Sequence, residues 1–136
     1  MLHYVAGGRK VRVMGVRLDF AEVTIDIESA MLDTGLDVAV FGPEEDVRSR
    51  AIDAPYRHGN IRGIAGKALP TQVRDTTVVL GTLQIPGELY TAPGREEWTL
   101  GLPVLRHFHL LLCDGDADVT AGPCLVAPPL LGNLRG

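Results

Sequence analysis

Short stretches in which apolar and polar residues alternate run along much of this chain, and glycines and prolines separate them. Such alternation is typical of β-strands with one buried face, whereas an amphipathic helix repeats its apolar positions about every 3.6 residues. Other stretches are short, continuously apolar and rich in valine, which favours buried strands. We predict strands over 11–20, 23–32, 38–41, 71–80 and 82–85, the last two joined near Gly81.

The segments between these strands predict turns, a helical turn and a short helix. Acidic residues at 44–46 indicate the start of a helical turn that continues to about residue 50. Pro103 fits the first turn of a short helix, where a missing backbone N–H costs little. The stretch 53–60 has no clear periodicity, so we expect a loop there. After Asp114 the pattern dissolves, and we expect 114–118 to be a solvated turn.

Length and composition fit one globular domain with its own core. The chain has 136 residues, of which 46% are hydrophobic and 22% charged. Its 16 glycines and 9 prolines, with 5% aromatic residues, favour many turns between short strands, so we expect a mostly β fold. We expect a single domain over 1–136, with a core over about 11–114 and a C-terminal extension over 115–136 that either contacts a dimer partner or is flexible.

Charge and composition argue against several kinds of partner. A net charge of −4 with scattered lysines and arginines gives no basic surface for nucleic acid or an acidic membrane. We find neither a signal-peptide core nor an apolar run of about 18 residues, so we expect a cytoplasmic protein without a membrane span. Cys113 and Cys124 are then expected to be free thiols. His107 and His109 lack a third ligand nearby, so we expect no metal and no cofactor.

The sequence Asp33-Thr34-Gly35 carries the candidate chemistry, because the apolar residues 30–32 lead directly into it. Asp-Thr-Gly is also an ordinary turn sequence. Peptide hydrolysis without a metal or a covalent intermediate needs two carboxyl groups, one ionised to activate water and one protonated to polarise the scissile carbonyl. We find no second Asp-Thr-Gly or Asp-Ser-Gly, and residues 75–77 lack the glycine. Two copies of the chain would therefore have to meet at Asp33.

Three segments, in this order and spacing, resemble the retropepsin-like family of small dimeric aspartic proteases. Residues 23–32 resemble the strand that leads into the catalytic loop, and Ile61–Gly66 resembles the glycine-rich flap. Residues 98–112 resemble the closing segment, in which apolar residues and Gly101 precede a short helix and a strand. The resemblance covers roughly Phe20 to Asp114.

The resemblance implies a single-domain closed β-barrel with one short C-terminal helix and an active site at the two-fold interface of a homodimer. It implies that Asp33 of each subunit activates water, with one proton shared between the two carboxyls, so that mildly acidic conditions favour activity. The Thr34 hydroxyl would bond across the axis, and Gly35 and Gly101 would allow close approach of the backbone. The residues expected to contact an extended polypeptide substrate are Leu36, Asp37, Gly63, Ile64, Ala65 and Gly66.

Two departures from the family pattern leave other readings open. Leu36 stands where alanine or serine is usual, which would narrow the substrate cleft. Leu102 replaces a polar residue that some members pair with the acid two residues after the motif. One alternative is therefore a retropepsin-like module that dimerises or binds peptides and cleaves nothing. Another is an unrelated small β-barrel in which Asp-Thr-Gly is only a turn.

Overall fold

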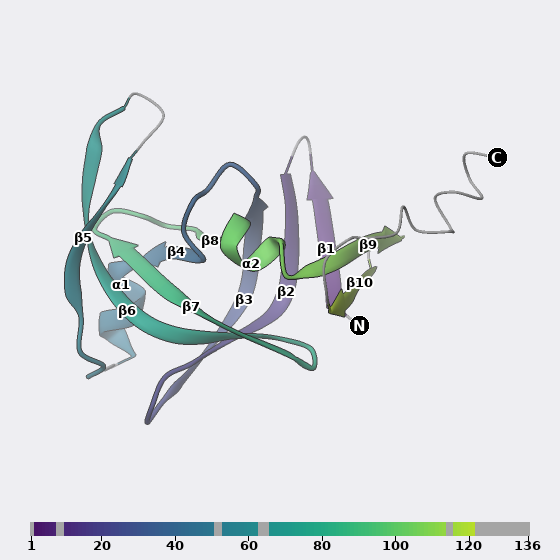
Figure 1. The fold of residues 1–136 in the computed structure, drawn as a ribbon, viewed down its shortest axis with the longest axis horizontal. Coiled ribbons are helices and arrows are strands. Elements are labelled where there is room, and N and C mark those ends of the chain that lie inside the picture. Colours follow the sequence, from purple (N-terminus) through teal and green to yellow (C-terminus); the bar gives the residue numbers. More distant parts are fainter. Residues whose placement is uncertain (1, 8–9, 51–52, 63–65, 114–115, 122–136) are drawn as a thin grey trace.

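The structure is a computed structural model of the chain, and it describes residues 2–7, 10–50, 53–62, 66–113 and 116–121. In this part of the chain ten strands form one continuous sheet, and two short helices lie between them (Figure 1). In chain order the elements are β1 (Leu2–Gly7), β2 (Lys10–Asp19), β3 (Thr24–Asp33), β4 (Val40–Pro43), α1 (Glu44–Ser49), β5 (Arg57–Arg62), β6 (Ala68–Leu80), β7 (Leu83–Ala92), β8 (Trp98–Gly101), α2 (Leu102–Leu105), β9 (Phe108–Cys113) and β10 (Asp116–Ala121).

Six of the strands close into a barrel in the order β6-β7-β4-β8-β3-β2, because β2 pairs with β6 as well as with β3. The closing ladder pairs Arg17, Leu18 and Asp19 with residues 77–79. The Thr76 hydroxyl supports it by donating to the Asp19 carbonyl oxygen at 2.9 Å. The β3–β8 and β4–β7 pairs are parallel, and the other barrel pairs are antiparallel. The predicted closed barrel is therefore confirmed.

Strands outside this ring extend the sheet at both ends. The β5–β6 hairpin rises at one end of the molecule, and β1, β10 and β9 continue the sheet at the other (Figure 1). Within the described residues no helix has the length and hydrophobicity needed to cross a membrane.

The barrel encloses an aliphatic core to which each of its strands contributes. Leu18, Ile25, Val78, Leu89 and Leu100 have essentially no exposed surface. In β2 the alternation shifts at Gly15: Val13 and Val16 are both buried although they lie three positions apart. Gly15 has a φ of 76°, a left-handed conformation that costs little in glycine. This shift explains why the segment alternates over only part of its length.

The elements predicted inside the barrel are confirmed with small shifts of their ends, except that the strand expected at 82–85 continues to Ala92. Strands β2, β3, β6 and β7 cover the predicted segments, and the short strand expected at 38–41 occupies Val40–Pro43 as β4. Helix α1 begins at Glu44, with three acidic residues in its first turn, and α2 has Pro103 in its first turn.

Two predictions outside the barrel are wrong. The loop expected over 53–60 is cut short because β5 begins at Arg57. The side chains of β5 are mostly exposed. That strand forms because its backbone pairs with β6, and without a buried face it leaves no apolar periodicity. The solvated turn expected over 114–118 gives way to β10, whose backbone pairs with β9 on one side and with β1 on the other.

Candidate active site

Asp33 is the last residue of β3, and the parallel ladder places it opposite Gly101, the last residue of β8. Its side chain is exposed, as are Thr34 and Gly35. The Gly35 backbone N–H donates to Oδ1 of Asp33 at 2.8 Å, and the Leu36 N–H donates to the Asp33 carbonyl oxygen at 3.2 Å. The turn therefore closes on its own carboxylate, while the Asp33 residue remains exposed.

The turn at Asp33 requires a residue without a side chain at Gly35. A Cβ at this position would lie 3.2 Å from Oδ1 of Asp33, which is tighter than ordinary van der Waals contact. A side chain here would push against the oxygen that the Gly35 N–H binds. The close backbone approach expected at Gly35 is present.

Gly101 anchors the loop that follows Asp33. Its N–H donates to the Ala39 carbonyl oxygen at 2.9 Å, and the Leu102 N–H donates to the Leu36 carbonyl oxygen at 2.9 Å. A Cβ on Gly101 would overlap the Val38 carbonyl oxygen and would lie 2.7 Å from that of Leu36. The loop thus packs against the junction of β8 and α2 in the way the sequence predicted.

A small apolar cluster, separate from the barrel core, lies between this loop and the β5–β6 hairpin. We call it the flap-base cluster. Ile61 comes from β5 and Leu36 from the catalytic loop, so the cluster ties the two segments together. The half-buried Leu36 side chain is part of this apolar contact. The members of the flap-base cluster are Leu36, Val38, Phe41, Ile61, Tyr90 and Ala92.

The hairpin occupies the place expected for a flap, with β5 paired to β6 from Arg57 to Arg62. Gly66 is exposed and has a φ of 76°, which suits the turn between the arms. The expected substrate contacts Gly63, Ile64 and Ala65 lie outside the described residues. Asp37 is exposed in the loop after the catalytic turn.

A polar side chain that sequence reasoning missed lies on the same side of the sheet. Arg95 donates from Nη2 to Oγ1 of Thr99 at 2.7 Å and from Nε to the Glu97 carbonyl oxygen at 3.2 Å. Its guanidinium carbon lies 4.2 Å from the centre of the Phe41 ring. Burial lowers the pKa of Arg95, and the negative charges of Glu97 and Asp33 oppose that shift. Arg95 therefore lies within the electrostatic reach of the candidate catalytic carboxylate.

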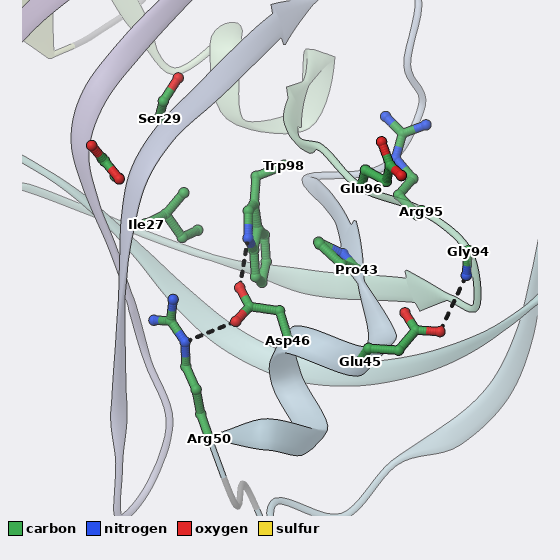
Figure 2. Close-up of a pocket in the computed structure, with 11 residues that line it drawn as sticks. Ile27, Ser29, Pro43, Glu45, Asp46, Arg50, Gly94, Arg95, Glu96 and Trp98 are labelled. Carbon is green, nitrogen blue, oxygen red and sulfur yellow. Dashed lines mark hydrogen bonds and ion pairs between the residues drawn. The ribbon is translucent and has the colours of Figure 1, made fainter.

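A shallow groove of about 670 Å³ lies elsewhere, between β3, α1 and the loop from β7 to β8 (Figure 2). Trp98 donates from Nε1 to Oδ2 of Asp46 at 3.0 Å, and Arg50 donates from Nε to Oδ1 of Asp46 at 3.1 Å. The Gly94 N–H donates to Oε1 of Glu45 at 3.2 Å. Arg95 lines this groove and Asp33 does not, and the bonds from Trp98 and Gly94 join α1 to β8 and to the loop before it. We therefore assign these contacts a structural role.

No group of three or more histidine, cysteine, aspartate or glutamate side chains in the described segments is placed to hold a metal ion. The exposed His107 belongs to those segments, whereas the expectation for Cys124 falls outside them.

Comparison with known proteins supports the fold. No protein-family model matches the chain, and no curated protein matches its sequence. The structure is similar to the crystal structure of a retropepsin-like aspartic protease from Rickettsia conorii, with a TM-score of 0.56 and 14% sequence identity. The match covers 90% of this chain and 92% of that chain. The chain thus has the retropepsin-like fold, and at this identity the likeness concerns the fold alone.

Proposed function

We propose that the chain is one subunit of a homodimeric aspartic endopeptidase that hydrolyses peptide bonds of an extended polypeptide. The observation that carries the proposal is the 2.8 Å bond from the Gly35 N–H to Oδ1 of Asp33, in a turn whose carboxylate is exposed. This bond restrains one carboxylate oxygen, and the exposure of Asp33 gives water access to the carboxyl group. General-base activation of water needs that combination of orientation and access.

The second carboxyl group comes from a second copy of the chain. A two-fold contact at the catalytic turn would set Asp33 against the Asp33 of the partner, because such an interface places the same residue on both sides of the axis. Thr34 and Gly35 are exposed in the single chain and so are accessible to a partner. One carboxyl then acts as base while the other, protonated, polarises the peptide carbonyl.

The substrate lies between the catalytic turn and the β5–β6 hairpin. An extended peptide binds such a site through backbone hydrogen bonds, while pockets for its side chains give selectivity. Asp37 and Gly66 are the proposed main-chain contacts among the described residues, and the sequence adds 63–65, which lie outside them. The flap-base cluster, to which both Leu36 and Ile61 belong, would position the hairpin relative to the turn.

The experiment is digestion of a diverse peptide mixture by the purified chain from acidic to neutral pH, analysed by mass spectrometry. Asp33→Asn is the matched control, because it keeps the size and most of the hydrogen bonding of the side chain. We expect cuts that disappear in Asp33→Asn, while both proteins sediment as dimers. Cuts that persist in Asp33→Asn would assign hydrolysis to a contaminant or another site.

Absence of cleavage overturns the proposal in two distinguishable ways. A folded dimer that binds peptides without cutting them is the non-cleaving module. A stable monomer that neither binds nor cuts is a barrel in which Asp-Thr-Gly is only a turn.

A further inference from the structure

We propose that Arg95 binds a carboxylate of the substrate, so that the site selects polypeptides with an aspartate or glutamate next to the bond that is cleaved. The assignment rests on the proposed function and names the class of substrate that the same site takes. It is carried by the position of Arg95, by the contacts that orient it and by the absence of a carboxylate partner.

Strand register places Arg95 on the catalytic face of the sheet. Asp33 pairs with Gly101, and two residues earlier Met31 pairs with Thr99. Residues two apart in a strand point to the same face, so Met31, Asp33 and Thr99 share one face. Phe41 of β4 also pairs with Thr99 and shares that face. Arg95 contacts Phe41 and Thr99, and therefore covers the sheet on the side from which Asp33 projects.

The contacts of Arg95 hold its guanidinium in one orientation. The flat group stacks on the Phe41 ring, Nε is bound by the Glu97 carbonyl and Nη2 by the Thr99 hydroxyl. These bonds use two of the five N–H donors of an arginine, and none of them involves a charged acceptor. Figure 2 shows the side chain on the loop from β7 to β8, with its guanidinium directed away from Asp46. The donors on Nη1 remain for a ligand.

Several other arginines of the structure form ion pairs with carboxylates, and Arg95 does not within the described residues. Arg48, Arg50 and Arg57 each form an ion pair with a carboxylate. Glu97, whose charge acts on Arg95, is already engaged by Arg12. Within the described residues Arg95 forms no ion pair, although it is half-buried.

A second arginine without a carboxylate partner serves as a contrast. Arg74 is 6% exposed, and its Nε and Nη1 are buried without hydrogen-bond partners. The Tyr56 ring packs 5.0 Å from its guanidinium carbon. A ligand has no access to Arg74 without displacing these neighbours, whereas Arg95 keeps part of its surface open.

A half-buried, oriented and unpaired guanidinium favours an acidic ligand over a neutral one. Arginine binds carboxylates through paired, charge-assisted hydrogen bonds, which are about twice as strong as neutral ones. A glutamine in the same place would accept one such bond but would bring no negative charge to the guanidinium. Discrimination between glutamate and glutamine is therefore expected to be about tenfold or more.

The test uses two pools of fluorescein-labelled random peptides that are identical except for a central glutamate or glutamine. The wild-type chain should cleave the glutamate pool with a kcat/KM at least about tenfold higher, with cuts next to the glutamate. Arg95→Met should reduce this ratio to near one by slowing only the glutamate pool. Arg95→Lys should retain part of the preference. A preference that survives in Arg95→Met, or none in the wild type, overturns the assignment.

Binding of the same pools to the Asp33→Asn variant separates this assignment from the proposed function. Fluorescence anisotropy should show tighter binding of the glutamate pool to Asp33→Asn and equal binding of both pools to Asp33→Asn/Arg95→Met. If the wild type cuts nothing but this difference is found, the protease proposal fails and the carboxylate site stands. Equal binding of both pools to Asp33→Asn overturns the site. Arg95→Gln, which keeps hydrogen-bond donors, replaces Arg95→Met if the latter does not fold.

Discussion

The carbonyl oxygen of Val38 occupies the space that a side chain on Gly101 would need. This contact joins the loop after the catalytic turn to the end of β8, directly opposite Asp33. The Val38 oxygen is a backbone atom and a Cβ on Gly101 would be fixed to the backbone, so neither could move away by rotation of a side chain. The position of the turn at Asp33 thus depends on the absence of a side chain one strand away.

Gly101→Ala should therefore destabilise the chain by about 3 kcal/mol through overpacking. Urea unfolding measures the loss. Gly94→Ala is the matched control, because Gly94 has a φ of 76° but no atom within 4 Å of its would-be Cβ. That control should cost only about 1–2 kcal/mol, the penalty of a left-handed residue with a side chain. Losses that are equal in both variants would contradict the close packing at Gly101.

Ile61→Ala should loosen the β5–β6 hairpin more than it weakens the barrel. Ile61 is 9% exposed in the flap-base cluster, and its truncation should cost about 2 kcal/mol. Hydrogen exchange should accelerate at the amides of β5 and remain slow in β2 and β3. Leu69→Ala, on the other arm and 41% exposed, should change exchange little. Uniform acceleration across all strands would contradict a local role for the cluster.

The bond between Trp98 and Asp46 should appear as a coupling energy in a double-mutant cycle. Trp98→Phe removes the indole N–H and Asp46→Ala removes its acceptor, which lies 3.0 Å away. A hydrogen bond to a charged group predicts a coupling of about 1.5–3 kcal/mol between the two changes in unfolding free energy. Strict additivity would show that the bond does not hold α1 against the barrel.

Arg74→Met should leave the stability unchanged or raise it by about 1 kcal/mol, because a buried charge with unpaired donors is replaced by an apolar chain of similar shape. Burial lowers the pKa of Arg74, with the charge of Glu44 opposing that shift, which is consistent with an unfavourable environment for the cation. Arg57→Met on the adjacent strand, where the arginine is exposed, should change the stability by less than about 1 kcal/mol. A marked loss of stability in Arg74→Met alone would contradict this account.

Thr34→Ala should weaken the proposed dimer. Loss of the hydroxyl bond across the two-fold axis should raise the dissociation constant about tenfold, which sedimentation equilibrium measures. Thr82→Ala, an exposed threonine in the turn between β6 and β7, should leave the dissociation constant unchanged. A dimer unaffected by Thr34→Ala would place the interface elsewhere.

Five of the six barrel strands were predicted from the sequence because each has a face in the core, whereas β8 was not predicted as a strand. In β6, Val73, Val78 and Leu80 are buried, and in β3 Ile25 and Ile27 are buried at alternate positions. The strands β1, β5 and β10 were missed or misplaced because they lie outside the barrel. In β5 most side chains are exposed, so its pairing with β6 leaves little pattern in the sequence.

The candidate site also contains residues that the sequence could identify and one that it could not. Asp33, Gly35 and Gly101 were accessible to sequence reasoning because a carboxylate in a glycine turn has a chemical meaning of its own. Arg95 was not, because its place near Asp33 depends on the register between β3 and β8. Had the pairing of β3 with β8 been inferred from Asp33 and Gly101, Thr99 would have been identified as a neighbour of the face from which Asp33 projects.

The short ladder that closes the barrel also bears on how fast the chain folds. Its partners in β2 and β6 lie about sixty residues apart in the sequence, whereas the β2–β3 and β6–β7 hairpins join near neighbours. Local pairings form sooner, since closing a long loop requires a larger loss of chain entropy. We expect both hairpins to form early and the docking of β2 on β6 to set the refolding rate. The residue pairs that complete the ring would then control its kinetics, although they are a small part of the finished sheet.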